Sequence, residues 1–158
     1  MTIRLATAAD IPAILALERE CASAAHWTEV QYQNLFQNGE AEISPRLLLV
    51  MDQPSMSSEK TESMLRGFLV ARRIGREWEL ENIAVAPTVR RKAIGTQLLA
   101  EFFRLARQGS GKSIFLEVRE SNHSARAFYE KFDFTQIARR KAYYQNPPED
   151  ALILRRLL

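Results

Sequence analysis

Three cationic side chains stand in a row where an apolar, strand-like run gives way to a helix. Arg90, Arg91 and Lys92 follow the run that ends at Val85 and precede an amphipathic segment that begins at Ile94. A helix start carries unpaired N–H groups and the positive end of the helix dipole, so cations there are unfavourable unless an anion binds. The segment therefore predicts a phosphate-binding loop, and the alternative is a solvated basic loop.

A carboxylate that could act as a general base lies in the predicted strand over 113–118. Apolar residues alternate there with Phe115 and Glu117, so the carboxylate shares one face of the strand with an aromatic ring. If helices cover both faces of the sheet, Glu117 lies in a partly apolar cleft, where a raised pKa suits a base. The alternative is an ordinary solvated strand position.

The composition excludes several other kinds of chemistry. Cys21 is the only cysteine, and His26 and His123 are the only histidines, so we expect no disulfide, no bound metal and no Ser-His-Asp triad. The net charge of +3 favours anionic partners, but no motif indicates nucleic acid. No apolar run suits a membrane span and no signal peptide is visible, so we expect a cytoplasmic protein without a membrane partner.

The elements that must position these residues follow from hydrophobic periodicity and capping patterns. We expect four helices: one that opens at Thr7–Asp10 and runs through Glu18, one from Thr28 to Gly39, one over 94–108 and one over 124–132. We expect strands over 3–5, 47–51, 65–74, 78–85, 113–118, 135–140 and 151–157. The polar segment 52–63 is predicted to be a mobile loop. The order predicts a single α+β domain over 1–158, with an antiparallel meander followed by a β-α-β-α-β run.

The pattern Arg90-x-x-Ala93-x-Gly95 resembles the pyrophosphate loop of the GNAT acetyltransferases. Further segments resemble, in order and spacing, the RimI-type subfamily of ribosomal-protein-alanine N-acetyltransferases. These segments are 26–28, 80–85, 116–122 and 127–134. Tyr143-Tyr144 and 149–151 are similar to the closing segment of that subfamily. The sequence departs from that pattern at Ala93 and Asp133, where glycine is usual, at His26, where proline is usual, and in the long 52–63 segment. The resemblance implies the GNAT fold, a mixed sheet of about six to seven strands flanked by about four helices.

The resemblance also implies that acetyl-CoA is the co-substrate and that two side chains assist the transfer. Glu117 is implied to remove a proton from the acceptor amine, and the Tyr129 hydroxyl to protonate the departing thiolate. Tyr129 otherwise only packs its helix onto the sheet. The residues implied to bind acetyl-CoA are Ile83, Ala84 and Val85 in a bulged and splayed strand, Arg90, Arg91, Lys92, Ala93, Ile94, Gly95 and Thr96 in the loop, and Asn122.

The same resemblance places the acceptor beside aromatic side chains. Trp27, Tyr143 and Tyr144 offer flat surfaces to an extended peptide, while Glu149 and Asp150 are expected to attract a basic second or later residue. Alternatively, the tyrosines cap the sheet and the acids neutralise nearby arginines.

The function implied is acetyl transfer to a protein N-terminal α-amine, with a small-subunit ribosomal protein beginning with alanine as the partner. A lysine side chain or a small-molecule amine is the alternative acceptor, because function depends on the site and not on the fold. A non-catalytic acyl-CoA sensor is the alternative of another class.

Overall fold

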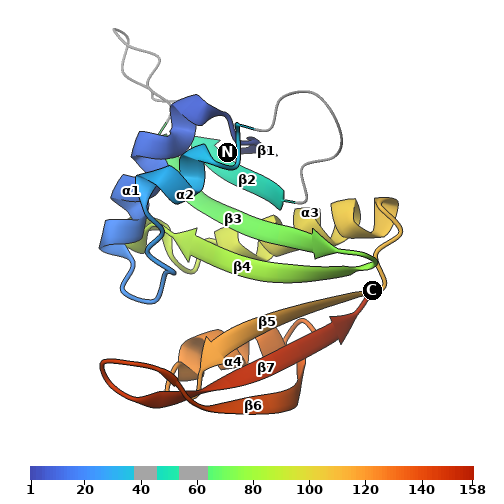
Figure 1. Cartoon of the computed structure of the whole chain (residues 1–158). Coiled ribbons are helices and arrows are strands. Elements are labelled where there is room, and N and C mark those ends of the chain that lie inside the picture. Colours follow the sequence, from blue (N-terminus) through green and yellow to red (C-terminus); the bar gives the residue numbers. More distant parts are fainter. Residues whose placement is uncertain (38–45, 54–63) are drawn as a thin grey trace, which may run out of the picture.

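A single mixed sheet of seven strands runs through the computed structural model, which describes residues 1–37, 46–53 and 64–158 (Figure 1). Its strand order is β1-β2-β3-β4-β5-β7-β6. The strands are β1 (Thr2–Leu5), β2 (Arg46–Gln53), β3 (Met64–Ile74), β4 (Glu77–Val85), β5 (Ser113–Arg119), β6 (Thr135–Tyr144) and β7 (Glu149–Leu157). This architecture agrees with the expected mixed sheet of about six to seven strands.

The first four strands form the expected antiparallel meander. Strand β2 is longer than predicted, because Asp52 pairs with Thr2 of β1 and its carboxylate accepts a hydrogen bond from Arg4 at 2.9 Å. Asp52 and Gln53 therefore belong to the sheet and not to the predicted 52–63 loop. The rest of that loop, 54–63, lies outside the described residues.

The last three strands are not in sequence order within the sheet. Strand β5 pairs with β4 in parallel, and β7 inserts between β5 and β6 with antiparallel pairing on both sides. The hairpin strands β6 and β7 extend beyond the predicted 135–140 and 151–157. Their ends therefore hold Tyr143, Tyr144, Glu149 and Asp150.

Four α-helices in the described part of the chain cover the two faces of the sheet. Figure 1 shows α1 (Ile11–Glu20) and α2 (Glu29–Gln33) on one face, with α3 (Ile94–Gln108) and α4 (His123–Glu130) on the other. Helix α3 buries an apolar stripe that includes Ile94, Leu98 and Phe102, as its spacing predicts. None of the described helices has the length and apolar character required to cross a membrane.

The second helix is shorter than predicted. Its capping box at Thr28 and Gln31 is present, but the helix ends at Gln33, and i→i+3 bonds tighten the chain into a turn at Leu35 and Phe36. The expected end at Gly39 lies outside the described residues.

Candidate active site

The loop between β4 and α3 presents a run of free backbone amides. After a 3₁₀ turn at Pro87–Val89, Arg91 and Ala93 adopt left-handed conformations with φ of 65° and 58°. The amide of Gln97 in α3 donates to the Ala93 carbonyl. Within the described residues, the six amides of 91–96 have no acceptor. Consecutive unpaired amides beside a helix start form an anion-binding site.

The cations beside these amides differ in their surroundings. Arg90, Arg91 and Lys92 are all exposed, and none of them forms an ion pair with a described carboxylate. The Arg90 guanidinium lies 3.9 Å from the Cys21 sulfur at the end of α1, whereas Arg91 and Lys92 contact no described polar group. All three cations therefore keep their charge available to an anion at the helix start.

The first turn of α3 packs closely against its neighbours. Ile94 is buried, Thr96 is exposed, and Gly95 lies against Phe128 of α4. A Cβ on Gly95 would stand 3.3 Å from the Phe128 ring, so an alanine there would require this ring to shift slightly.

Strands β4 and β5 separate beside this loop. They pair only over Glu77–Glu79 of β4, and β4 carries a bulge at Glu81. The Ala86 amide donates to the Arg66 carbonyl near the start of β3. In an antiparallel ladder the bonded residues alternate, so the amides of Ile83 and Val85 point to the open side of β4.

Glu117 lies on the face of β5 that carries Phe115, as predicted, but it has a cationic neighbour. Its carboxylate forms an ion pair with Arg140 of β6, with Oε1 at 3.2 Å from Nη1. A hydrogen bond with this carboxylate is the main reason why the pKa of Tyr143 is raised above its ordinary value. The surroundings of Glu117 are therefore ionic as well as aromatic.

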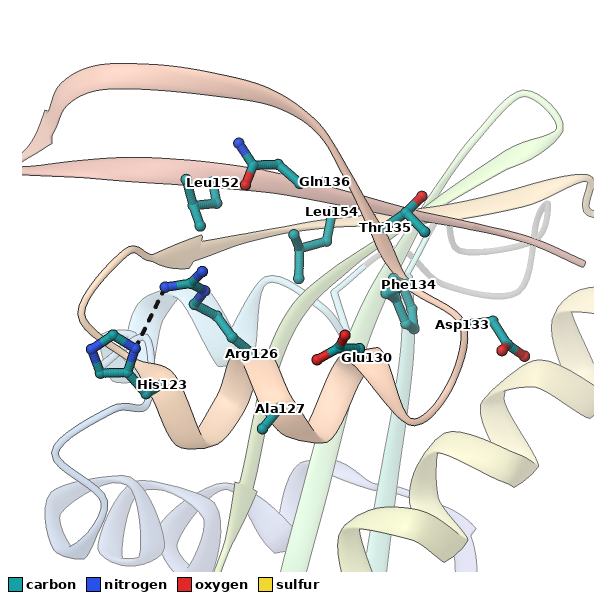
Figure 2. A pocket seen from close by; sticks show the side chains of 10 residues that line it. All are labelled: His123, Arg126, Ala127, Glu130, Asp133, Phe134, Thr135, Gln136, Leu152 and Leu154. Carbon is teal, nitrogen blue, oxygen red and sulfur yellow. Dashed lines mark hydrogen bonds between the residues drawn. The ribbon is translucent and has the colours of Figure 1, made fainter.

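Tyr129 lies on the other side of β5. Its α4 helix faces Leu152 and Leu154 of β7 across a groove of about 640 Å³ (Figure 2). These leucines pair with Val118 and Leu116, so α4 covers the face of β5 opposite to Glu117. The Tyr129 ring packs on Phe128 and Phe134 with centroids at 5.5 Å, and burial raises the pKa of its hydroxyl. This tyrosine therefore keeps its proton at neutral pH.

Asn122 caps the helix that carries Tyr129. Its side-chain oxygen accepts a hydrogen bond from the Ala125 amide at 3.1 Å and another from the Ser124 hydroxyl. Its side-chain amide nitrogen has no acceptor in the part of the chain that the structure describes. That nitrogen is the group left for a ligand.

The predicted acceptor aromatics belong to two separate ring pairs. Trp27 packs against Tyr32 at 5.4 Å between centroids, and the Arg46 guanidinium stands 5.7 Å above its ring. Tyr143 and Tyr144 pack edge to face at 5.2 Å at the end of β6.

Glu149 and Asp150 already have partners within the chain. Glu149 accepts a hydrogen bond from the Ser121 amide at 2.6 Å and forms an ion pair with Arg119 at 3.4 Å. Asp150 accepts from the Ala142 amide at 2.9 Å and pairs with Arg139 at 2.8 Å. These hydrogen bonds hold the pKa of each carboxyl below its usual range. Both acids therefore brace the β6–β7 hairpin.

Comparison with known proteins identifies the family. The model of the acetyltransferase (GNAT) family matches residues 11–134. The chain belongs to this family. The [ribosomal protein bS18]-alanine N-acetyltransferase of Salmonella typhimurium is 29% identical over 156 residues, 97% of this chain and 95% of the relative. The N-alpha-acetyltransferase RimI of Mycobacterium tuberculosis is 35% identical over 96 residues, 58% of this chain and 59% of the relative.

Other relatives of higher identity also align over only part of their own length, 62% or less. The crystal structure of the ribosomal-protein-S18-alanine N-acetyltransferase from Escherichia coli matches this GNAT chain with a TM-score of 0.78 at 25% identity. That match covers 99% of this chain and 92% of the other.

All three residues that depart from the GNAT pattern have positive φ. Ala93 (58°) and Asp133 (60°) stand where the pattern has glycine, and both adopt the left-handed conformation that glycine favours. His26 has φ of 54°, which the ring of the usual proline forbids, so the turn before α2 differs from one built on proline.

A buried polar group that was not predicted ties this turn to β4. Glu18 of α1 and Asn82 of β4 are 2% and 5% exposed, and the Asn82 amide nitrogen donates to Glu18 Oε1 at 2.5 Å. The amides of Ala25 and Trp27 donate to Asn82 and Glu18 at 3.2 and 3.4 Å. Burial, with Glu18 nearby, raises the pKa of Tyr32. The sequence did indicate this buried group, because Glu18 lies at helical spacing on the apolar face of α1, where a carboxylate is unusual.

Proposed function

We propose that this GNAT chain transfers an acetyl group from acetyl-CoA to the α-amine at the N-terminus of a protein. The observation that carries the proposal is the run of six free amides at 91–96 beside Arg91 and Lys92. A pyrophosphate needs several donors and cations at one place, and a helix start supplies them. The Asn122 side-chain nitrogen is the proposed donor to the pantetheine arm.

The two proposed catalytic side chains act from opposite faces of β5. When bound, acetyl-CoA supplies an acetyl thioester. Glu117 accepts a proton from the attacking amine, directly or through water, and Tyr129 holds a proton for the sulfur on the other face. The amides of Ile83 and Val85 face the open edge of β4, where they would polarise a carbonyl. This direct attack requires no covalent enzyme intermediate.

We further propose that the acceptor is a ribosomal protein whose N-terminal residue is alanine, as in the names of the relatives, and that the transfer takes place in the cytoplasm. Trp27, Tyr143 and Tyr144 are the proposed contacts of the extended peptide. An α-amine has a pKa near 7.7–8.0 against about 10.4 for lysine, so a carboxylate base at neutral pH suits the N-terminus better. Glu149 and Asp150 are proposed to act on the peptide only through the hairpin that they brace.

Mass spectrometry of peptides incubated with acetyl-CoA tests the proposal. A peptide that begins with alanine and contains one lysine should gain a single acetyl group on its α-amine. The same peptide blocked at the α-amine should gain none. Labelling of the lysine in both peptides would contradict N-terminal acetylation and favour a lysine acceptor. Tight acetyl-CoA binding without transfer to any amine would favour the alternative that the chain is a non-catalytic acyl-CoA sensor.

A further inference from the structure

A row of ion pairs crosses the sheet face on which we place the acceptor. Arg72 of β3 bonds Glu79 of β4 at 2.5 Å and lies 3.7 Å from Glu81, which also pairs with Arg46 of β2 at 2.9 Å. Beyond the opening between β4 and β5, Glu117 pairs with Arg140. We call these six residues the charged row: Arg46, Glu81, Arg72, Glu79, Glu117 and Arg140.

The strand register shows that the row lies on one face. Arg46 is the cross-strand partner of Arg72, Arg72 is the partner of Glu79, and Glu79 is the partner of Phe115 in β5. Cross-strand partners point to the same side, and Glu117 shares the face of Phe115. The same face carries α2, because Phe68, four residues before Arg72 in β3, packs against Tyr32. Figure 1 shows no helix over its β5–β7 part.

The arginines, and not the acids, are the groups that this face offers to a ligand. The Arg72 side chain is 40% exposed and Glu79 is 21% exposed, while Arg140 is 54% exposed and Glu117 is 19% exposed. The carboxylates therefore turn inward and the guanidinium groups turn outward. A ligand that lies across the row meets positive charge first.

Both arginines also keep hydrogen-bond donors for a second partner. Arg72 uses Nε and Nη2 on Glu79, and Arg140 uses Nη1 on Glu117. Nη1 of Arg72 and the remaining nitrogens of Arg140 have no acceptor in the described ranges. A guanidinium has five N–H donors in a planar fork, and a carboxylate matches this fork.

We propose that the charged row selects acceptors that carry a carboxylate close to the reacting amine. For a protein N-terminus, this means acidic residues directly after the first residue, bound by Arg72 and Arg140. The inference rests on the proposed acetyl transfer and defines its acceptor class. It assigns selectivity to the arginines of the row and not to Glu149 and Asp150, whose charges are paired within the hairpin.

Three C-terminally amidated peptides that differ only at positions two and three test this inference: Ala-Glu-Glu, Ala-Gln-Gln and Ala-Lys-Lys followed by one common sequence. The Glu peptide should show a kcat/KM at least about tenfold above that of the Lys peptide, mainly through KM, and the ratio should shrink at high salt. Arg72→Gln should lower this ratio, because it exposes the acids of the row. Arg104→Gln is the matched control, since Arg104 forms a similar exposed pair with Glu101 on α3.

The outcomes separate the inference from the proposed function. Equal kcat/KM for the three peptides, each labelled on its α-amine, would overturn the carboxylate preference and leave N-terminal acetylation standing. If no peptide is acetylated, calorimetry with the protein saturated by coenzyme A still compares their binding. Tighter binding of the Glu peptide would support the charged row, and equal binding would overturn it. Acetylation of free glutamate but of no peptide would support carboxylate selection by the charged row and would contradict the proposed protein acceptor.

Discussion

Ala93 occupies a backbone conformation that costs an alanine about 1 kcal/mol relative to glycine. We expect Ala93→Gly to raise the free energy of unfolding by up to about that amount and to leave acetyl-CoA binding equal or tighter, because the loop keeps its shape. Ala100→Gly, at an exposed helical position of α3, is the control and should lower stability by about 1 kcal/mol. Urea denaturation and calorimetry measure both. Weaker cofactor binding by the Ala93 variant would show that the loop adopts another shape.

The two proposed catalytic residues differ in what they contribute. Glu117→Gln should lower kcat strongly, by about 100-fold or more, because it removes the proton acceptor. Tyr129→Phe should also lower kcat, because the buried hydroxyl whose pKa is raised no longer supplies a proton. Stopped-flow or steady-state rates with saturating peptide measure both effects, and calorimetry should find the acetyl-CoA affinity unchanged. Near-normal rates in both variants would contradict the proposed roles of Glu117 as base and Tyr129 as acid.

At the scale of elements, Asp10 links the start of α1 to β1. Its carboxylate accepts hydrogen bonds from the Arg4 guanidinium and the Thr7 amide, both at 2.8 Å. The hydrogen bond from Arg4 is the main reason why the pKa of Asp10 lies below its usual value. A lowered pKa means that the stabilisation is complete above the unfolded-state pKa of about 3.9 and is lost as the pH falls below it.

We therefore expect Asp10→Asn to be less stable than the unmodified chain at pH 7 and the difference to shrink as the pH falls from about 4 towards 2. Urea midpoints at each pH measure this difference. Arg104→Gln, which breaks an exposed pair, is the control and should change stability little. A difference that does not depend on pH would show that the Asp10 charge is not involved.

The turn between α1 and α2 depends on the bonds that Asn82 makes. Asn82→Ala removes the acceptor of the Ala25 amide and one donor to Glu18, and it should cost about 1–3 kcal/mol of stability because two buried polar groups each lose a hydrogen bond. Because the turn carries Trp27, the KM of the acceptor peptide should rise while acetyl-CoA affinity stays the same. A rise in the Kd of acetyl-CoA with an unchanged KM for the peptide would contradict this prediction, because it would show that Asn82 affects cofactor binding and not acceptor binding.

At the scale of the whole molecule, the proposed cofactor site joins two parts of the sheet that pair with each other at only three positions. Acetyl-CoA should therefore slow hydrogen exchange at Ile83, Val85 and the amides of 91–96, which have no acceptor without it. At a concentration of 100 times Kd it should stabilise the fold by about 2.7 kcal/mol. Exchange measured by mass spectrometry with and without acetyl-CoA checks this. The amides of β1, far along the sheet, are the internal control.

The sequence by itself determined the features that local patterns control. Alternation and capping boxes predicted the strands and the starts of α2 at Thr28 and α3 at Ile94, because such signals act within a few residues. The capping box at Thr7 opens a 3₁₀ turn over Ala8–Asp10, and α1 begins after it at Ile11. The local patterns also placed the cations of residues 90–92 at a helix start. The same reasoning failed at the end of α2 and at the ends of β2, β6 and β7, where pairing with distant strands or tight turns sets the boundaries.

Only the tertiary structure decided which distant residues meet. The insertion of β7 between β5 and β6 brings Arg140 to Glu117, and no local pattern encodes that order because strand neighbours are chosen by long-range pairing. The separation of β4 from β5 beyond Glu79, the Glu18–Asn82 contact and the charged row depend on the same pairings. The sequence thus identified the loop for the cofactor, and the packing of the sheet decided which charges face the acceptor.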